Sequence, residues 1–509
     1  MTAWLLFWPV LLPILTASLC LVFWSRPDLQ RTVSLLGTAV LAAGILALFQ
    51  EVWTGGIVSV QAGDWPAPFG ITFVADTLSV TMAALTALIG LGVAVYAMGD
   101  IGQERERNGF HPLFQALLAG VGGAFMTGDI FNMYVWFEVM VIASFGLMTL
   151  GGEREQIDGG VKYVLLNLIA TTLMLMAIGL LYGATGTLNL ADLAQVVPDH
   201  PDRGLLSAIA ALFLLAFAMK AAVFPLYFWL PASYHTPAAA VSAVFAALLT
   251  KVGVYALIRV FSLVFTESQD FTYAVLLVAG IVTMLVGVLG AIAQDDVRRV
   301  LSFNLVSGIG FILIGVGLGT ALGLAGALYY TVHHIIVMSA LFMVAGVVQR
   351  LAGAPGLNDL GGLYLKHPWI AVLFFFVAMS LAGVPPLSGF WPKVILVKAS
   401  LATDAYIVAG AALVTGLLTL YSMAKVWSLA FWKAQPDHVV AAPGPGIMEV
   451  GEMTRGQQRM TLLPVAVLAL ATLLIGLYAQ PLLTLSERAA DELINHQPYV
   501  TTVLGGEGT

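Results

Sequence analysis

Long apolar stretches recur along this chain, and each is long enough to cross a membrane as a helix. Many windows hold the roughly 20 mainly apolar residues that span a hydrocarbon core. Charged residues make up only 10% of the chain, against roughly 25% in a soluble domain. A water-soluble fold could not bury so much apolar surface, and β-barrel strands would show short alternating segments instead. The sequence therefore predicts an all-α polytopic membrane protein.

We expect about fourteen transmembrane helices, with boundaries set by the polar residues between apolar stretches. The predicted spans cover residues 4–24, 33–51, 73–97, 112–128, 130–150, 163–183, 205–230, 236–264, 271–293, 300–319, 322–349, 369–399, 404–432 and 461–480. The first span lacks a basic leader and a small-residue cleavage site, so we interpret it as a retained helix. We interpret residues 434–459 as a cytoplasmic linker. The polar tail from Ser486 is expected to contact solvent or a partner.

The distribution of basic residues between the loops predicts the orientation of these helices. Loops that follow odd-numbered spans carry most of the loop lysine and arginine, including Arg105, Arg154, Lys162, Arg298, Arg299 and Arg350. The opposite side carries only Arg203, Arg259 and Arg488. Because cytoplasmic loops are enriched in Lys and Arg, we expect the odd loops to be cytoplasmic and both termini to lie outside.

Two predicted spans contain proline clusters that should break the helix. The first reads Lys220-Ala-Ala-Val-Phe-Pro225-Leu, and the second reads Val-Pro385-Pro386-Leu-Ser-Gly-Phe-Trp-Pro-Lys393. Such breaks persist in a membrane only where protein or water satisfies the freed backbone groups. They fall in the seventh and twelfth spans, an odd number apart, so related units would be inverted, and paired breaks then indicate an ion site. Ordinary proline kinks are the alternative.

These patterns predict a division of the chain into four parts. Residues 1–110 would hold the first three helices, and residues 111–265 a first antiporter-like repeat of five helices. Residues 266–433 would form a second, inverted five-helix repeat, and residues 434–509 the linker, the last helix and the polar tail. Each repeat would then contain one proline-broken helix.

Several charged side chains fall inside predicted spans. The lysines in this position are Lys220, Lys251, Lys393, Lys398 and Lys425. A charged side chain at the bilayer centre costs about 2.5–3.5 kcal/mol. Because several such charges together carry a large energetic cost, we expect them to have a functional role and regard the intramembrane charges as the candidate functional site.

Glu138 lies well inside the fifth predicted span. A lone buried carboxyl group is expected to be protonated, whereas a nearby ammonium favours the ionised form. Lys220, just before the first break, is the expected partner. At ~8 Å and an effective dielectric constant of ~20 their attraction is about 2 kcal/mol, so moving one partner would change protonation at neutral pH. A static ion pair between two helices is the alternative.

Lys251 and a histidine pair are further candidates for proton transfer. Lys251 has no acidic residue near it in the sequence, and a desolvated lysine can exchange protons near neutral pH. The eleventh span contains Tyr329, Tyr330, His333 and His334, and histidine can relay protons through its two nitrogens. The alternatives are a lysine that reaches the interface and a core histidine. A metal site is disfavoured because no third ligand follows at suitable spacing.

The remaining candidates lie nearer the span ends. Lys393 directly follows the second break, and we predict that it is the terminal proton carrier of the second half. Lys398 and Lys425 lie toward opposite ends of their spans, where a lysine can reach the interface. Lys425 and Asp129 are kept as secondary candidates, while Asp129 and Asp76 have an interfacial position as the alternative.

The sequence gives no sign of a redox centre or a nucleic-acid site. Cys20 is the one cysteine, which excludes an intramolecular disulfide and a cysteine-ligated cluster. The chain lacks a dinucleotide-binding fingerprint and a haem signature. A net charge of −7 without a basic cluster argues against nucleic acid. We expect no cofactor, no metal and no enzymatic reaction in this chain.

With these residues in view, the chain resembles the antiporter-like subunits shared by respiratory complex I, membrane-bound hydrogenases and Mrp-type Na⁺/H⁺ antiporters. The resemblance covers nearly the whole chain, and it is greatest for the D-type subunits of Mrp antiporters. The motifs that carry it are Thr127-Gly-Asp129-Ile-Phe-Asn132…Trp136-Phe-Glu138, Lys220…Phe224-Pro225-Leu…Trp229-Leu-Pro231, Tyr234-His235-Thr-Pro237, Arg299-Val-Leu-Ser302-Phe-Asn304, Gly383-Val-Pro385-Pro386-Leu-Ser-Gly389-Phe and His333-His334-Ile-Ile-Val.

The resemblance implies roles for the intramembrane charges. The residues matching Glu138 and Lys220 form a pair in the proton path of the family, the one matching Lys251 is the central relay, and the one matching Lys393 connects to the far side. Close relatives often carry a lysine shortly after the histidine pair, where this chain has Met338. The link between the halves would then depend on His334 and water.

The resemblance also implies a multi-pass subunit of a bacterial plasma-membrane complex, with partner subunits of the A, B, C, E, F and G types. We expect H⁺ to pass through this subunit, because Na⁺ would need several oxygen ligands and the buried polar residues are mostly lysines. Passage of Na⁺ stays open. The alternatives are a proton-pumping subunit of a complex I or hydrogenase-type redox complex and a non-transporting scaffold.

Overall fold

The computed structural model describes residues 3–266, 269–434 and 453–505. Within these ranges twelve helices are long and apolar enough to cross a membrane. Two shorter apolar helices, Phe110–Met126 and Pro368–Ala382, complete a set that corresponds to the predicted spans. The all-α polytopic fold is therefore confirmed. Most of the predicted linker, residues 435–452, lies outside the described residues.

The elements follow one another with short connections. The first are η1 (Ala3–Phe7), α1 (Trp8–Val22), α2 (Pro27–Gly55), β1 (Val58–Gln61), η2 (Ala62–Asp64), β2 (Thr72–Ala75), α3 (Thr77–Asp100), α4 (Gly102–Arg107), α5 (Phe110–Met126) and α6 (Ile130–Met148). Next come α7 (Arg154–Thr185), α8 (Leu190–Val196), α9 (Arg203–Ala221), α10 (Trp229–Ser233), α11 (Ala239–Val244), η3 (Phe245–Leu249) and α12 (Thr250–Leu263). The second half has α13 (Gln269–Ala293), α14 (Val297–Gly317), α15 (Ala321–Ala352), α16 (Leu363–Lys366), α17 (Pro368–Ala382), α18 (Phe390–Ala402), α19 (Tyr406–Trp427) and η4 (Ser428–Trp432). The last are α20 (Arg455–Leu477), α21 (Ala479–Ile494) and α22 (Gln497–Leu504).

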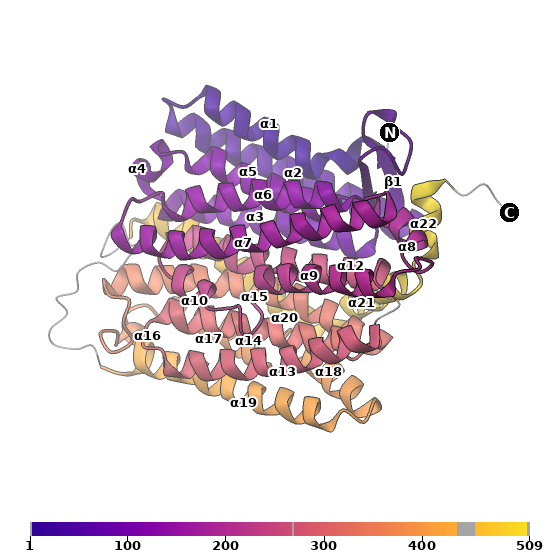
Figure 1. Ribbon diagram of the computed structural model, residues 1–509. Coiled ribbons are helices and arrows are strands. Elements are labelled where there is room, and N and C mark those ends of the chain that lie inside the picture. The colour runs from indigo at the N-terminus through magenta and orange to yellow at the C-terminus, as the bar shows by residue number, and fades with distance from the viewer. Residues whose placement is uncertain (1–2, 267–268, 435–452, 506–509) are drawn as a thin grey trace.

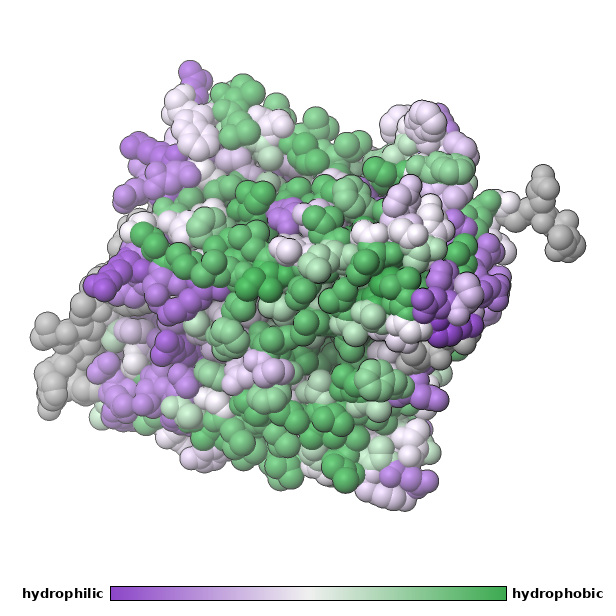
Figure 2. Space-filling view, viewed as in Figure 1, coloured by the Kyte–Doolittle hydropathy of each residue, from purple (hydrophilic) through white to green (hydrophobic). Residues whose placement is uncertain are grey.

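The long helices run roughly parallel and form a bundle with α15 near its centre (Figure 1). Both ends of the chain lie at one end of this bundle, together with α8 and α22, while α4, α10 and α16 lie at the other end. Hydrophobic residues cover the middle of the bundle and hydrophilic residues gather at its two ends (Figure 2). This distribution is that of a protein surrounded by lipid along its sides.

Capping residues fix where many of the helices begin. Asp76 caps α3, and its carboxylate and the Ser79 hydroxyl form a capping box. Asp296 caps α14 by accepting from the Arg299 N–H, and Thr454 caps α20 with Gln457. Because the Thr454 box lies in the predicted linker, α20 begins six residues before the predicted span at 461.

The two proline clusters break their helices in the same way. The first half-helix, α9, ends with Ala222 in the left-handed conformation, at φ 59°, and the second, α17, ends with Gly383 at φ 90°. In both breaks the N–H of the next residue, Val223 or Val384, donates to a carbonyl five residues back. Short helices, α10 and α18, resume after each cluster. The predicted breaks are present, and they share one backbone geometry.

A small extramembrane layer covers the end of the bundle that holds both termini. Strands β1 and β2 pair antiparallel, with Val58 opposite Ala75 and Gln61 opposite Thr72. The Asn189 side chain, at the start of α8, donates to the Thr72 hydroxyl at 2.9 Å. This hairpin was not predicted, because its strands are shorter than a pattern of alternating residues can indicate.

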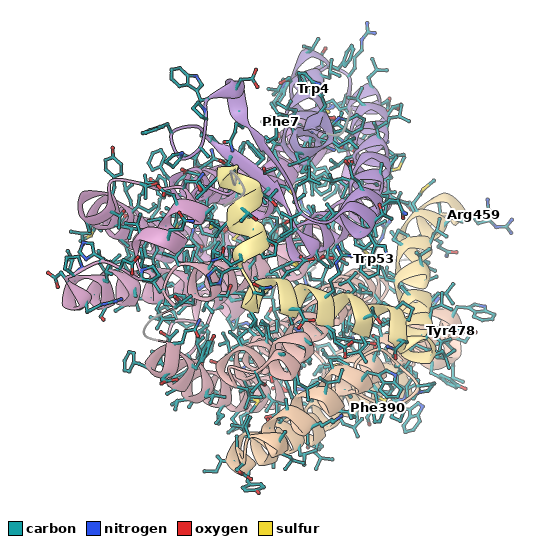
Figure 3. The ribbon with its side chains drawn as sticks, turned by 90° about the vertical axis from the view of Figure 1, so that its right-hand side faces the viewer. Trp4, Phe7, Trp53, Phe390, Arg459 and Tyr478 are labelled. Atoms are coloured by element: carbon teal, nitrogen blue, oxygen red, sulfur yellow. The ribbon has the colours of Figure 1, made fainter. Side chains whose placement is uncertain are left out.

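The polar tail packs back onto its own chain as α21 and α22, rather than extending freely to solvent. One face of α21 buries Ser486, Ala489, Ala490 and Leu493, a helical spacing that places small and apolar side chains toward the bundle. Seen from this end, α21 lies across the ends of the membrane helices, starting beside Tyr478 and passing near Trp53 (Figure 3).

Two charged residues of α21 bind the termini of earlier helices. The Arg488 guanidinium donates to the carbonyls of Trp53 at 2.6 Å and Val52 at 3.0 Å, at the C-terminus of α2. The Glu492 carboxylate accepts from the N–H and the hydroxyl of Thr77, at the N-terminus of α3. Each charge has the sign that the helix dipole favours at that terminus.

A buried ion pair connects α3 with α12 under this layer. The Arg259 guanidinium lies 2.5 Å from the Asp76 carboxylate, and both side chains are almost fully buried. The rings of Tyr255 and Tyr499 lie over the guanidinium at 5.4 and 5.3 Å. Asp76 and Arg259, which the sequence placed near span ends, are therefore structural partners.

Replacing Asp76 by Asn is expected to destabilise the protein by about 3–5 kcal/mol, because Arg259 would stay buried without its counter-charge. Asparagine keeps the helix cap, so the loss reports on the charge. The thermal unfolding midpoint of the purified protein measures the effect.

Asp28→Asn is the matched control, since Asp28 pairs with Arg31 at 3.5 Å while its side chain is 89% exposed. An exposed pair contributes at most about 1 kcal/mol. Equal midpoints for Asp76→Asn and Asp28→Asn would show that the buried pair does not stabilise the fold.

Candidate functional site

The intramembrane charges lie on helices that follow one another across the bundle. Glu138 is on α6, Lys220 on α9 and Lys251 on α12. The histidine pair is on α15 and Lys393 on α18. Helix α12 packs against α9, and α15 packs against η3 and α18. In Figure 1 these helices lead from the half drawn in magenta to the half drawn in orange.

Glu138 and Lys220 face each other without direct contact. Lys220 is buried in the last turn of α9, and its Nζ has no hydrogen-bond partner among the described residues. The Phe137 ring on α6 lies 5.5 Å from this Nζ, and the neighbouring Glu138 carboxylate acts on it electrostatically. An attraction without a hydrogen bond leaves both groups free to bind water or exchange protons.

Lys251 is fully buried at a local change in helix geometry. The preceding segment η3 is a π-helical turn, and the Lys251 Nζ donates to the Ala246 carbonyl at 2.6 Å. Turns of this kind occur often at functional sites because they free backbone groups. A Cβ at Gly253 would lie 2.9 Å from the Lys220 Cβ, so the backbones carrying the two lysines approach closely.

His334 lies between the two sets of lysines. Both of its ring nitrogens are buried without a partner among the described residues, and Lys251, His333 and Lys393 all act on it electrostatically. A Cβ at Gly308 would lie 2.2 Å from its Nε2, so the ring rests against the backbone of α14. Met338, one turn later on α15, is buried and apolar.

His333 points to the second break instead. Its Nδ1 lies 2.8 Å from the Ser388 hydroxyl, and its Nε2 has no partner among the described side chains and backbone groups. The Tyr330 ring packs against both histidines, with centroid distances of 5.6 Å to His333 and 5.5 Å to His334. The two neighbouring histidines therefore have different surroundings.

Lys393 binds the end of the half-helix before its break. Its Nζ donates to the carbonyls of Leu381 at 3.0 Å and Ala382 at 2.8 Å, at the C-terminus of α17. The Phe311 ring lies 5.1 Å away. Carbonyls at a helix C-terminus attract a cation, so the end of α17 provides a binding site for the Lys393 ammonium.

In the first break other groups satisfy the freed backbone. The Trp229 indole donates to the Met219 carbonyl at 3.0 Å, and the Thr283 hydroxyl accepts from the Phe224 N–H at 3.0 Å. In this break an indole, rather than a lysine ammonium, therefore binds a carbonyl of the last turn of the half-helix.

The secondary lysines have other partners. Lys425 donates to the carbonyls of Ile292 at 3.0 Å and Gln294 at 2.8 Å and lies 3.3 Å from the Asp295 carboxylate, at the C-terminal end of α13. Lys398 is exposed on α18. Both lysines are placed like side chains that reach the membrane–water interface, and neither lies between the other candidate residues.

Asp129 caps α6 at the end of the bundle that holds the termini. Its carboxylate accepts from the Asn132 N–H at 2.7 Å. Burial raises the pKa of Asp129 to about 6, although hydrogen bonds from the backbone of Asn132 and Phe131 oppose the shift. This carboxyl group therefore changes its charge at about pH 6, at the N-terminal end of the helix that carries Glu138.

A second group of charges was missed by sequence reasoning. Near the opposite end of the bundle, the Asp100 carboxylate accepts from the Ala240 N–H at 2.9 Å, at the start of the helix that carries Lys251. Arg298 donates to the Pro237 carbonyl at 2.6 Å, and Arg350 to the Gly99 carbonyl at 2.8 Å. The Arg299-Val-Leu-Ser motif was the signal for this region, but the positive-inside reading counted Arg298 only as a loop charge.

The candidate site contains buried polar atoms that lack protein partners among the described residues. In the part of the chain that the structure describes, no three His, Cys, Asp or Glu side chains come together as a metal site. Buried polar atoms without protein partners, such as the Lys220 Nζ and the His334 nitrogens, are normally hydrated. Titratable side chains joined by water can pass protons along the membrane plane.

Comparisons with known proteins identify relatives of this chain. The family model for the NADH:quinone oxidoreductase/Mrp antiporter transmembrane region matches residues 127–419. The D-type subunit of the Na⁺/H⁺ antiporter of Alkalihalophilus pseudofirmus is 43% identical over 97% of this chain and 98% of its own length.

Two solved structures have the same fold. A chain in the Mrp complex from Dietzia sp. superimposes with a TM-score of 0.89 at 33% identity, over 98% of this chain and 99% of that one. A chain of respiratory complex I from Thermus thermophilus gives a TM-score of 0.79 at 24% identity, over 96% and 99%. At that identity the second likeness concerns the fold alone.

The Asp129 carboxyl group is expected to lose its proton as the pH rises through about 6, rather than near 4, because burial disfavours the charged form. Infrared difference spectra of the purified protein between pH 4 and 8 would record its carboxyl C=O band. Asp129→Asn keeps the cap and should remove that band. Identical titrations of the variant and the parent protein would contradict the assignment.

Proposed function

This chain belongs to the transmembrane family shared by NADH:quinone oxidoreductase and Mrp antiporters, together with the D-type subunits of the Na⁺/H⁺ antiporters, and from that membership we propose that it relays protons for Na⁺/H⁺ antiport. The proposed relay uses Glu138, Lys220, Lys251, His334, His333 and Lys393. The observation that carries the proposal is the position of His334, which lies within electrostatic range of both Lys251 and Lys393.

The proposed relay begins at Glu138 and Lys220. Because their charged groups attract without touching, a small displacement of either one changes the proton affinity of both. Protons reach Lys251 next, which is close to Lys220 through the tight packing of Gly253. Lys251 is held by one backbone carbonyl, so its ammonium can give up a proton without breaking an ion pair.

His334 joins the two halves. Its free nitrogens can accept a proton on one side and release one on the other. The Met338 position then needs no lysine, since His334 itself interacts with the lysines of both halves. Lys393 receives the proton beside the second break, with His333 as its neighbour.

We propose that residues 111–265 and 266–433 are the two inverted units that this relay joins. The common geometry of the two breaks supports this division, because Ala222 and Gly383 end their half-helices with the same pattern of hydrogen bonds. Residues 1–110 and 434–509 then lie outside the units. Helix α20 packs against α17 and α15, and so braces the second unit.

The proposed setting is the plasma membrane of a bacterium, within a multisubunit Mrp complex that contains A, B, C, E, F and G type subunits. The basic loops, including Arg105 and Arg350, would face the cytoplasm, and both termini would lie outside. H⁺ is the ion proposed for this subunit, since buried lysines and histidines, Lys220, Lys251, His333 and His334, lie on helices that follow one another across the bundle.

The second candidate is a proton-pumping subunit of a redox complex. The observation in its favour is the fold shared with a complex I chain. The composition of the purified complex distinguishes the two, because a redox complex would bring Fe–S or flavin proteins, and an antiporter would bring small hydrophobic subunits.

Lys393→Ala is expected to lower Na⁺-driven proton exchange by about tenfold or more in vesicles that contain the complete complex, because the second half loses its proton carrier. A pH-sensitive dye inside the vesicles reports the exchange. Lys398→Ala is the matched control, since Lys398 lies five residues later on the same helix but is exposed. Equal losses for the two variants would count against the relay.

Lys220→Arg and Lys220→Ala distinguish a relay from a static ion pair. Arginine keeps the positive charge opposite Glu138 but does not release its proton. A relay predicts that both variants lose most of their exchange in the same vesicles. Retained exchange in Lys220→Arg alone would instead support a structural pair.

A further inference from the structure

A pair of buried serines lies between His333 and the second break. The Ser388 hydroxyl is 2.8 Å from the His333 Nδ1 and 3.0 Å from the Ser380 hydroxyl. Ser380 belongs to the last turn of α17, and Ser388 to the segment between α17 and α18. The Ser388 N–H also donates to the Thr472 carbonyl of α20 at 3.0 Å, so its backbone is fixed from outside the break.

The other edge of His333 faces the helix of Lys393. A Cβ at Gly389 would lie 2.9 Å from the His333 Nε2. This edge of the ring therefore fits against Gly389 only because glycine has no side chain. Gly389 and Lys393 are four residues apart at the start of α18, and therefore share one face of it. The Nε2, which is buried without a partner among the described residues, points to the face that carries Lys393.

The first break shows that the backbone geometry does not need these serines. When the two left-handed residues, Ala222 and Gly383, are aligned, Met219 corresponds to Ser380 and Tyr227 to Ser388. The same hydrogen bonds close both half-helices. The serine pair therefore has a purpose beyond forming the break.

We propose that Ser388 and Ser380 are positioning residues that set the tautomer of His333. They thereby decide whether its Nε2 presents a lone pair or a hydrogen to the face of α18 that carries Lys393. This inference rests on the proposed function, because the tautomer matters only if protons pass this point.

Two arrangements of the same three groups are available. When the Nδ1–H donates to Ser388, the Ser388 hydroxyl donates to Ser380, and the Nε2 lone pair can accept a proton. When the Ser380 hydroxyl donates to Ser388, the Ser388 hydroxyl donates to Nδ1, and the Nε2 carries the hydrogen. A hydroxyl pair can rotate between these states while the heavy atoms stay in place, which a backbone partner could not do.

The titratable groups around His333 are few. Lys393 on α18 acts on it electrostatically, and His334 and Tyr330 are its neighbours on α15. A change in the pH dependence of exchange in a serine variant would therefore report on this group of side chains.

The test uses Na⁺-driven proton exchange by the complete complex in vesicles, measured from pH 6 to 9. Ser388→Ala should lower the rate by about tenfold and shift the pH of half-maximal exchange by about half a unit or more, because the His333 Nδ1 loses the hydrogen-bond partner that sets its tautomer. Ser388→Thr keeps the hydroxyl and should stay within about twofold of the parent rate, with an unchanged pH profile. Ser380→Met, which copies the first break, should shift the pH profile like Ser388→Ala.

His333→Ala separates this inference from the proposed function. If His333→Ala loses exchange while Ser388→Ala keeps the parent rate and pH profile, the serine pair does not position the histidine and the inference fails. If His333→Ala keeps exchange, the relay does not use His333 and the proposed function is wrong at this step. Co-purification of the partner subunits checks assembly, and if Ser388→Ala does not assemble, the pH profile of Ser380→Met decides.

Discussion

The structure depends on satisfying the backbone groups that two broken helices release inside an apolar slab. At the first break the Trp229 indole binds the Met219 carbonyl, and at the second the Lys393 ammonium binds the carbonyls of Leu381 and Ala382. Without such partners each freed group would cost several kcal/mol in a hydrocarbon environment. The two breaks differ in this respect, since the Lys393 ammonium of α18 binds the end of α17, whereas the Lys220 ammonium has no hydrogen-bond partner among the described residues.

The same requirement explains how the buried charges are tolerated. Lys251 binds the Ala246 carbonyl within its own helix, at a π-helical turn, and so needs no acidic partner. By contrast, Arg259 is fully paired with Asp76 and enclosed by two tyrosine rings. A paired arginine stabilises the fold, whereas lysines and histidines with incomplete partners can change protonation. Burial alone does not tell the two kinds of charge apart.

The sequence was sufficient to predict the helices and both breaks, because hydrophobic length and proline chemistry act locally. It also identified the charged residues inside the predicted spans, since a lysine within an apolar stretch can be recognised without a structure, but it missed the contacts of Asp100 and Arg298 near the span ends. It could not predict what depends on contacts distant in sequence, such as Asp76 with Arg259, or Lys425 with the end of α13. The different surroundings of His333 and His334 could not be predicted either. Adjacent residues on a helix point in different directions, and the helices that each one contacts cannot be identified from the sequence. The packing of the polar tail against its own chain could not be predicted for the same reason.

Helix α21 has a consequence for the order in which the molecule is completed. Its Arg488 and Glu492 bind the end of α2 and the beginning of α3, which are hundreds of residues earlier in the chain. The ribosome releases Arg488 and Glu492 only after the membrane helices have been made. The C-terminus of α2 and the N-terminus of α3 therefore lack these partners during synthesis and membrane insertion. The contacts of α21 and α22 with the N-terminal part of the protein therefore form late, and a chain that ended before α21 would lack them.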